Sequence, residues 1–242
     1  MLVAAAVCPC PPLLVPELAA GAAPELDAAR AACTDALGVL AAARPDLLVV
    51  VGPGEGSGHA AYPQGTRSTF RGFGVDIDVR LGRAEGDADA PALTERRLPS
   101  SLAVAAWLLE RTGWSDAPIE GLGVGEPLTA ERCTDIGRDI AARAERVTLL
   151  VMGDASACRT LKAPGYLDER AAPFDASVAR ALGKADVSAL KGLDIELARE
   201  LKASGRVPWQ VLAGAAEGAG LSGTLLYDEA PYGVGYLVAT WS

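Results

Sequence analysis

The stretch PDLLVVVGPGEGSGH, residues 45–59, sets the fold class of this chain. An uninterrupted apolar run that ends at glycine is typical of a strand buried on both faces, as in parallel sheets covered by helices. The same pattern returns in VTLLVMGDASACRT, residues 147–160, and the apolar opening MLVAAAV, residues 1–7, ends as sharply at CPCPP. We therefore predict three buried strands whose carboxyl ends lead into loops.

Helical patterns separate and follow these strands. In residues 24–44 an apolar stripe runs through Cys33 at the spacing of one helix face, and Pro24 stands where proline prefers to begin a helix. Serine at the start of SSLAVAAWLLERTGW, residues 100–114, can cap a second helix. Further helices are expected over residues 129–146, over residues 174–205 with breaks at Gly183 and Gly192, and over residues 209–220.

The remaining strand patterns are shorter. Residues 75–81 alternate apolar and polar side chains, residues 119–128 can hold a short strand, and two β-rich runs in residues 223–241 flank a Pro/Gly turn, as in an antiparallel hairpin. The polar segment of residues 83–99 is expected to be a surface loop. Together these patterns predict an α/β fold: a single domain, residues 1–242, with a mixed, mainly parallel central sheet and helices on both faces.

Composition limits the classes of partner. The chain has 242 residues and a formal net charge of −9, which repels polyphosphate, so we expect no nucleic-acid partner. Its longest apolar runs fall far short of the roughly 20 residues that a membrane helix needs. No basic residue precedes the apolar opening, as one would in a signal peptide. We expect a cytoplasmic protein with no membrane partner, and the sequence leaves open whether it forms a homo-oligomer.

The five cysteines fall into two groups. Cys33 and Cys133 lie on the apolar stripes of predicted helices, where cysteine behaves as a small buried hydrophobe. Cys8, Cys10 and Cys158 lie just past apolar runs, in segments rich in residues that break helices and strands. We expect reduced thiols rather than disulfides, and we expect the second group to be accessible and to react first with a thiol reagent.

Thiol, carboxylate and imidazole side chains, which can bind ligands or take part in catalysis, follow the predicted strands. Ligands of open α/β sheets bind at the carboxyl ends of the strands. Those ends hold Cys10, then Glu55 with His59, and then Asp154 with Cys158. If the three strands are neighbours, these side chains converge on one crevice. A plainer interpretation is also open, in which the glycines around Glu55 form a turn, His59 faces solvent and Asp154 caps a local turn.

Five segments of the chain carry a family resemblance. They are CPCPPLLVPE (residues 8–17), LVVVGPGE (48–55), GDASACRTLKAPGYLDERAAPFDASV (153–178), ASGRVPWQVLAGAAEG (203–218) and LLYDEAPYGVGYLVATW (225–241). In this order and spacing they resemble the LigB-like superfamily, which contains the B subunits of class III extradiol ring-cleaving dioxygenases and the Memo proteins. The resemblance spans nearly the whole chain and implies a three-layer α/β/α fold.

The dioxygenases of that superfamily hold ferrous iron through two histidines and a carboxylate, and use a further histidine as acid/base. The resemblance places Cys10 at the first ligand and Glu55 at the second. It places Ala157 at the acid/base histidine and Ser204 at the third ligand. None of the four is the family's usual residue. Because alanine can neither bind a metal nor transfer a proton, the resemblance implies the fold but not iron-dependent ring cleavage.

Three functions stay open. The first is a divergent LigB-like protein that lacks ring-cleaving activity and binds a small molecule in the crevice without a cofactor. The second is a metalloenzyme whose rebuilt site for a divalent zinc or iron ion uses Cys10, His59 and Cys158, with Glu55 or Cys8 as a further ligand. The third is a metal-free thiol enzyme with Cys10 as nucleophile and His59 as base. We favour the first, because a rebuilt site needs several coordinated replacements.

Overall fold

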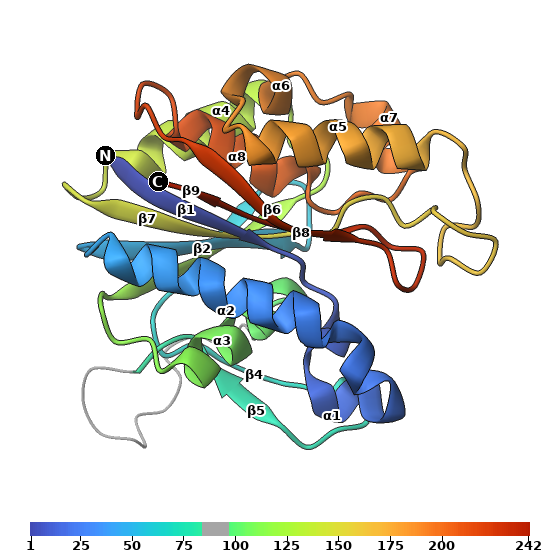
Figure 1. Cartoon of the computed structure of the whole chain (residues 1–242). Coiled ribbons are helices and arrows are strands. Elements are labelled where there is room, and N and C mark those ends of the chain that lie inside the picture. Colours follow the sequence, from blue (N-terminus) through green and yellow to red (C-terminus); the bar gives the residue numbers. More distant parts are fainter. Residues whose placement is uncertain (84–96) are drawn as a thin grey trace.

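The structure is a computed structural model that describes residues 1–83 and 97–242 (Figure 1). Most of the surface loop predicted for residues 83–99 lies outside the described residues. The strands are β1 (Leu2–Cys8), β2 (Leu47–Gly54), β3 (His59–Tyr62), β4 (Arg67–Thr69), β5 (Asp78–Arg80), β6 (Ile119–Gly125), β7 (Val147–Met152), β8 (Gly223–Glu229) and β9 (Tyr236–Trp241).

Within the described residues, seven of these strands form the central sheet in the order β3-β6-β2-β7-β1-β9-β8, and β4 pairs with β5 separately. The four strands from β6 to β1 are parallel, whereas β3 and β9 run antiparallel to their neighbours. The three strands predicted from their apolar runs, β2, β7 and β1, are consecutive in the sheet. Their carboxyl ends therefore share one rim.

Helices cover both faces of this sheet. They are α1 (Pro16–Ala19), α2 (Asp27–Ala42), α3 (Ser100–Thr112), α4 (Ala130–Ala141), α5 (Ala171–Gly183), α6 (Val187–Lys191), α7 (Ile195–Glu200) and α8 (Arg206–Ala215). Figure 1 shows α2 and α3 on one face and α4, α5 and α8 on the other. Side chains alternate accordingly, so that Val7 and Val151 enter one core, and Cys8 and Met152 enter the other.

The predicted α/β fold is therefore confirmed, with a mainly parallel sheet between two helical layers. The predicted breaks at Gly183 and Gly192 and the closing β8–β9 hairpin are also confirmed. None of the helices within residues 1–83 and 97–242 combines the length and the apolar character that crossing a bilayer requires.

Three local predictions differ from the structure. The helix predicted for residues 24–44 begins at Asp27, because Pro24 lies inside a short 3-10 segment, Ala20–Leu26. The strand predicted over residues 75–81 shortens to β5, which pairs with β4 and not with the central sheet. His59 does not stand in a loop but begins β3, a short edge strand.

Candidate functional site

Backbone hydrogen bonds hold the rim where β1 and β7 end. Cys8 and Met152, the last residues of the two strands, pair in register, and the Gly153 N–H donates to the Cys8 carbonyl over 3.0 Å. Just beyond, the Cys10 N–H donates to Oδ1 of Asp154 over 2.8 Å. The parallel pairing of two buried strands thereby brings the first residues of both loops into contact.

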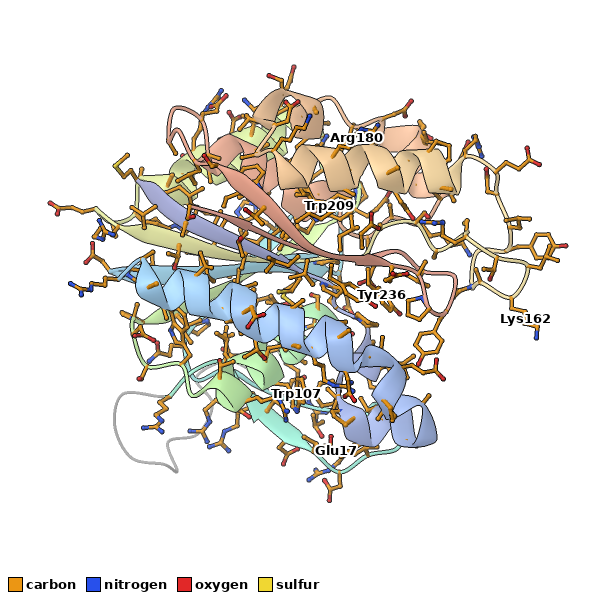
Figure 2. All side chains as sticks on the ribbon, viewed as in Figure 1. Glu17, Trp107, Lys162, Arg180, Trp209 and Tyr236 are labelled. Atoms are coloured by element: carbon orange, nitrogen blue, oxygen red, sulfur yellow. The ribbon has the colours of Figure 1, made fainter. Side chains whose placement is uncertain are left out.

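The segment that contains Ser204 also lies at this rim. The Asp154 N–H donates to Oγ of Ser204 over 3.0 Å, and Ser204 also makes a side-chain hydrogen bond with Cys10. Tyr236, the first residue of β9, lies near enough for its phenol to experience the charge of Asp154, and Figure 2 labels it at this end of the sheet. We call Cys10, Asp154, Ser204 and Tyr236 the rim cluster. Asp154 and Ser204 are partly exposed, whereas the other two are buried.

Two glycines let these segments approach one another. A Cβ atom on Gly153 would lie 2.4 Å from the Cα of Gly205, and a Cβ atom on Gly205 would lie 2.2 Å from the ring of Trp209. Both distances are far inside van der Waals contact. Glycine at these two positions therefore allows the backbone of Ser204 to reach Asp154.

Burial and charge set the protonation of the rim cluster. Burial raises the pKa of Asp154 to about 7, against the lowering effect of the Cys10 N–H. Burial, and then the charge of Asp154, raise the pKa of the Cys10 thiol well above its ordinary value, although Ser204 lowers it. Burial also raises the pKa of Tyr236. At neutral pH the cluster therefore presents a carboxyl that exchanges its proton readily, beside a protonated thiol and a protonated phenol.

A buried carboxylate fixes the loop that carries Asp154. Asp175 on α5 is 1% exposed, and it accepts hydrogen bonds from the N–H and Oγ of Ser156, each over 2.8 Å, and from Nη1 of Arg159 over 3.0 Å. The Gly235 N–H donates to the Ser156 carbonyl over 2.8 Å. The loop after β7 is thus tied both to α5 and to the segment before β9, which positions Asp154.

Glu55 and His59 lie at the same end of the sheet but outside the rim cluster. Both are exposed. Glu55 follows β2, which β7 separates from β1, whereas β6, β2 and β7 all lie between β1 and the strand that His59 begins. Since neighbouring strands are about 4.8 Å apart, roughly 19 Å of sheet separates His59 from β1. The predicted convergence is found only in part, because Cys10, Asp154 and Ser204 meet without Glu55 or His59.

The predicted accessibility of Cys8, Cys10 and Cys158 is wrong, because all five cysteines are buried. Cys8 ends β1 with its side chain in the core and its thiol hydrogen-bonded to Cys33. The Cys158 thiol donates to the Leu201 carbonyl over 3.5 Å, beneath the surface of its loop. The burial predicted for the two helix cysteines is confirmed. A break after an apolar run brings a thiol to the rim of the sheet, but neighbouring loops then cover it.

The donor sets proposed from the sequence do not fit a metal ion. Across the described residues, no three His, Cys, Asp or Glu side chains are placed to hold one together. Cys10, His59 and Cys158 lie on separate elements that do not converge. In the set implied by the resemblance, Cys10 keeps its proton, Ser204 offers a neutral hydroxyl and Glu55 stands in an exposed loop. Such a set has no imidazole, and its one carboxylate, Glu55, lies apart from Cys10 and Ser204, so it does not match the two histidines and carboxylate of a ferrous triad.

Comparison with known proteins adds a distant structural likeness. No family model and no curated protein sequence matches the chain. Among similar solved structures is the crystal structure of the uncharacterized protein JW3007 from Escherichia coli K12, which is 14% identical, with a TM-score of 0.49, over 99% of this chain and 100% of that chain. A likeness of this size assigns neither a family nor an activity.

Ala157, at the position that the resemblance gives to an acid/base histidine, has a structural role. It is buried, its N–H donates to the Leu201 carbonyl over 2.8 Å, and its carbonyl accepts the Gly165 N–H over 2.8 Å. Its methyl group offers no proton, so Asp154, three residues earlier, is the nearby group that can exchange one near neutral pH.

Two residues of this region, Tyr236 and Asp175, were not predicted from the sequence. Both lie inside segments quoted for the family resemblance, yet neither follows one of the three apolar runs used to find the rim. Tyr236 reaches the rim because β9 is inserted beside β1, and Asp175 reaches it because α5 packs over the loop after β7. A search for buried polar residues in predicted helices would have found Asp175.

Proposed function

We propose that this chain is a divergent LigB-like protein that binds a small hydroxylated molecule at the rim cluster and lacks iron-dependent ring cleavage. The observation that carries the proposal is the placement of Asp154, a partly exposed residue whose carboxyl has a pKa of about 7, where two central strands end. Open α/β sheets bind their ligands at this end. The family resemblance independently places Cys10 and Ser204 at ligand positions, and these two residues lie beside Asp154.

Asp154 can form a hydrogen bond with a hydroxylated ligand in either of its protonation states. Its ionised form accepts a hydrogen bond from a hydroxyl, and its neutral form donates one. Because Oδ1 accepts the Cys10 N–H, a ligand would meet Oδ2. The buried thiol and phenol beside it are both protonated and uncharged, which suits an aromatic or aliphatic alcohol better than an ion.

The two enzyme alternatives have less support. A thiol enzyme needs a thiolate and a base, but burial holds the Cys10 thiol protonated and His59 lies several strands away. A rebuilt metal centre needs three converging ligands, and the described residues bring no such set together.

The first prediction concerns ring cleavage. The purified chain, supplied with ferrous iron, oxygen and catechol or protocatechuate, should form no ring-opened product above the rate of a protein-free control. The reason is that Ala157 cannot transfer a proton, and that Cys10, Glu55 and Ser204 do not form an iron triad. Absorbance of the yellow product measures the outcome, and product formation that a chelator abolishes would overturn this part of the proposal.

The second prediction concerns binding itself. Catechol, used as a hydroxylated probe, should bind the metal-free chain near neutral pH, and Asp154→Asn should weaken that binding by about 10-fold, the usual effect of losing a hydrogen bond to a charged group. Saturation-transfer NMR titrations measure both affinities. Asp139→Asn makes the same change on an exposed face of α4 and should leave the affinity unchanged. Equal binding by the wild type and Asp154→Asn would exclude the rim cluster as the site.

A further inference from the structure

The central sheet has two edge strands, and they differ in length. Within residues 1–83 and 97–242, β3 stands at one edge of the sheet and β8 at the other. β3 has four residues, whereas β8 has seven and runs between α5 and α2 (Figure 1). The outer side of an edge strand presents backbone N–H and C=O groups that can pair with another chain, and many proteins limit such pairing with short or charged edges. β8 is the longer of the two open edges.

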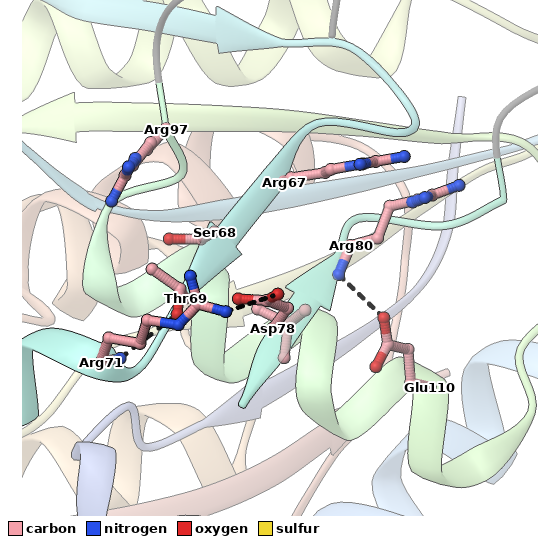
Figure 3. A pocket seen from close by; sticks show the side chains of 9 residues that line it. Arg67, Ser68, Thr69, Arg71, Asp78, Arg80, Arg97 and Glu110 are labelled. Carbon is pink, nitrogen blue, oxygen red and sulfur yellow. Dashed lines mark hydrogen bonds and ion pairs between the residues drawn. The ribbon is translucent and has the colours of Figure 1, made fainter. Parts of the chain in front are cut away.

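The middle of β8 is apolar and exposed. Leu225 and Leu226 are 37% and 39% exposed. The small β4–β5 sheet differs, because its strands have three residues each and carry charged side chains that include Arg67, Asp78 and Arg80 (Figure 3). Charges of this kind discourage pairing with a further strand, whereas exposed apolar side chains on a longer edge favour it.

The pairing of β8 with β9 assigns its side chains to the two faces of the sheet. Directly paired residues of antiparallel strands point to the same face. Asp228 pairs with Leu237, which belongs to the core under α5. Tyr227 pairs with Val238, which belongs to the core under α2. The carboxylate of Asp228 therefore lies on the α5 face, near the end of β8.

A basic side chain lies on the same face, at the start of β8. The turn after α5 packs against Gly223, where an added Cβ atom would lie 2.5 Å from the Ala185 backbone nitrogen. Lys184 in this turn is exposed, as is Asp228. In the described part of the chain neither of these two residues forms an ion pair, and nearby Asp186 caps the start of α6. The open edge therefore has an unpaired positive charge at one end and an unpaired negative charge at the other.

We propose that β8 pairs with β8 of a second copy of this chain, antiparallel about a two-fold axis perpendicular to the sheet. Such an axis keeps the α5 layers of both copies on one side and brings the end of each β8 to the start of the other. Asp228 of each copy then approaches Lys184 of the partner subunit, and the exposed leucines meet near the axis. None of these residues belongs to the rim cluster, so the dimer does not depend on the function proposed above.

The first test is sedimentation velocity of the full chain at about 1 to 100 µM, a range that spans half-assembly of a micromolar interface. The wild type should be dimeric at the upper end. Leu226→Lys should weaken association by about 100-fold, because residue 226 is the middle of β8 and two new charges would oppose one another at the axis. Leu161→Lys makes the same change at a leucine that is 62% exposed in the loop after β7, and it should associate like the wild type.

The second test exchanges the charges at the two ends of β8. Lys184→Glu and Asp228→Lys should each weaken association by about 10-fold, because each brings like charges together twice in the dimer. The double variant restores opposite charges and should regain wild-type association. Arg180→Glu reverses a charge elsewhere on α5 (Figure 2) and should have no effect.

Circular dichroism should be the same for all these variants, because every changed side chain is exposed. A wild type that stays monomeric at 100 µM, an equal loss of association in Leu226→Lys and Leu161→Lys, or a double charge variant that does not recover would each overturn the proposal.

Discussion

Asp175→Ala is expected to lower the free energy of unfolding by about 3 to 5 kcal/mol, the range typical of removing one partner from a buried ionic network. The carboxylate is 1% exposed and accepts hydrogen bonds from Ser156 and Arg159. Alanine leaves the N–H and hydroxyl of the fully buried Ser156 without an acceptor, and it leaves Arg159, whose side chain is 30% exposed, without its buried partner. Urea unfolding at neutral pH, followed by circular dichroism, measures the change.

Two further variants serve as controls for Asp175→Ala. Asp139→Ala removes an exposed carboxylate from α4 and should change the unfolding free energy by no more than about 0.5 kcal/mol. Ser156→Ala removes only the hydroxyl donor to Asp175 and should cost about 1 kcal/mol. A loss in Asp175→Ala no larger than that in Ser156→Ala would show that the network is not what holds the loop after β7.

The central layer of the fold could be predicted from the sequence because it depends on local patterns. Apolar runs ending at glycine marked β2 and β7, and the abrupt break after residues 1–7 marked β1. Whether such strands are neighbours depends on long-range pairing, so the shared rim was predicted only on the condition that they are. The structure meets this condition, because β2, β7 and β1 are consecutive in the sheet.

The rest of the candidate site depended on contacts that local patterns do not encode. His59 was expected in the crevice because it follows β2 closely in sequence, but pairing with β6 carries it to the edge of the sheet. Cys158 was expected at the surface because its segment has no periodicity, but its thiol turns inward to the Leu201 carbonyl. Tyr236 arrives only because β9 lies beside β1.

Asp175 and Asp154 differ in the number of hydrogen-bond donors that surround their carboxyl groups. Asp175 has three donors that include a guanidinium group, and these donors oppose the burial that still raises its pKa. Asp154 has the Cys10 N–H as the donor to its carboxyl and a burial cost that raises its pKa to about 7. A carboxyl held in this way destabilises the protein when it is charged, as binding and catalytic groups commonly do.

Asp154→Asn should therefore stabilise the protein, in a way that depends on pH. An unfolded aspartate has a pKa of about 3.9, whereas Asp154 in the folded chain has a pKa of about 7. Between these values the folded state binds more protons than the unfolded state, so stability falls as the pH rises from about 4 to about 7. Each pKa unit is worth about 1.4 kcal/mol, so the difference of about three units between the two states is worth about 4 kcal/mol at most.

The asparagine side chain does not titrate, but its oxygen can still accept a hydrogen bond from the Cys10 N–H. The variant should be about 2 to 4 kcal/mol more stable than the wild type near pH 8 and nearly equal to it near pH 3, where the aspartate is mostly neutral in both the folded and the unfolded state. Urea unfolding at a series of pH values measures this difference, and Asp139→Asn on the exposed face of α4 should show none of it. A gain in Asp154→Asn that is the same at every pH would mean that the carboxyl is ionised without cost. Asp154 would then lose the property for which we assign it to ligand binding.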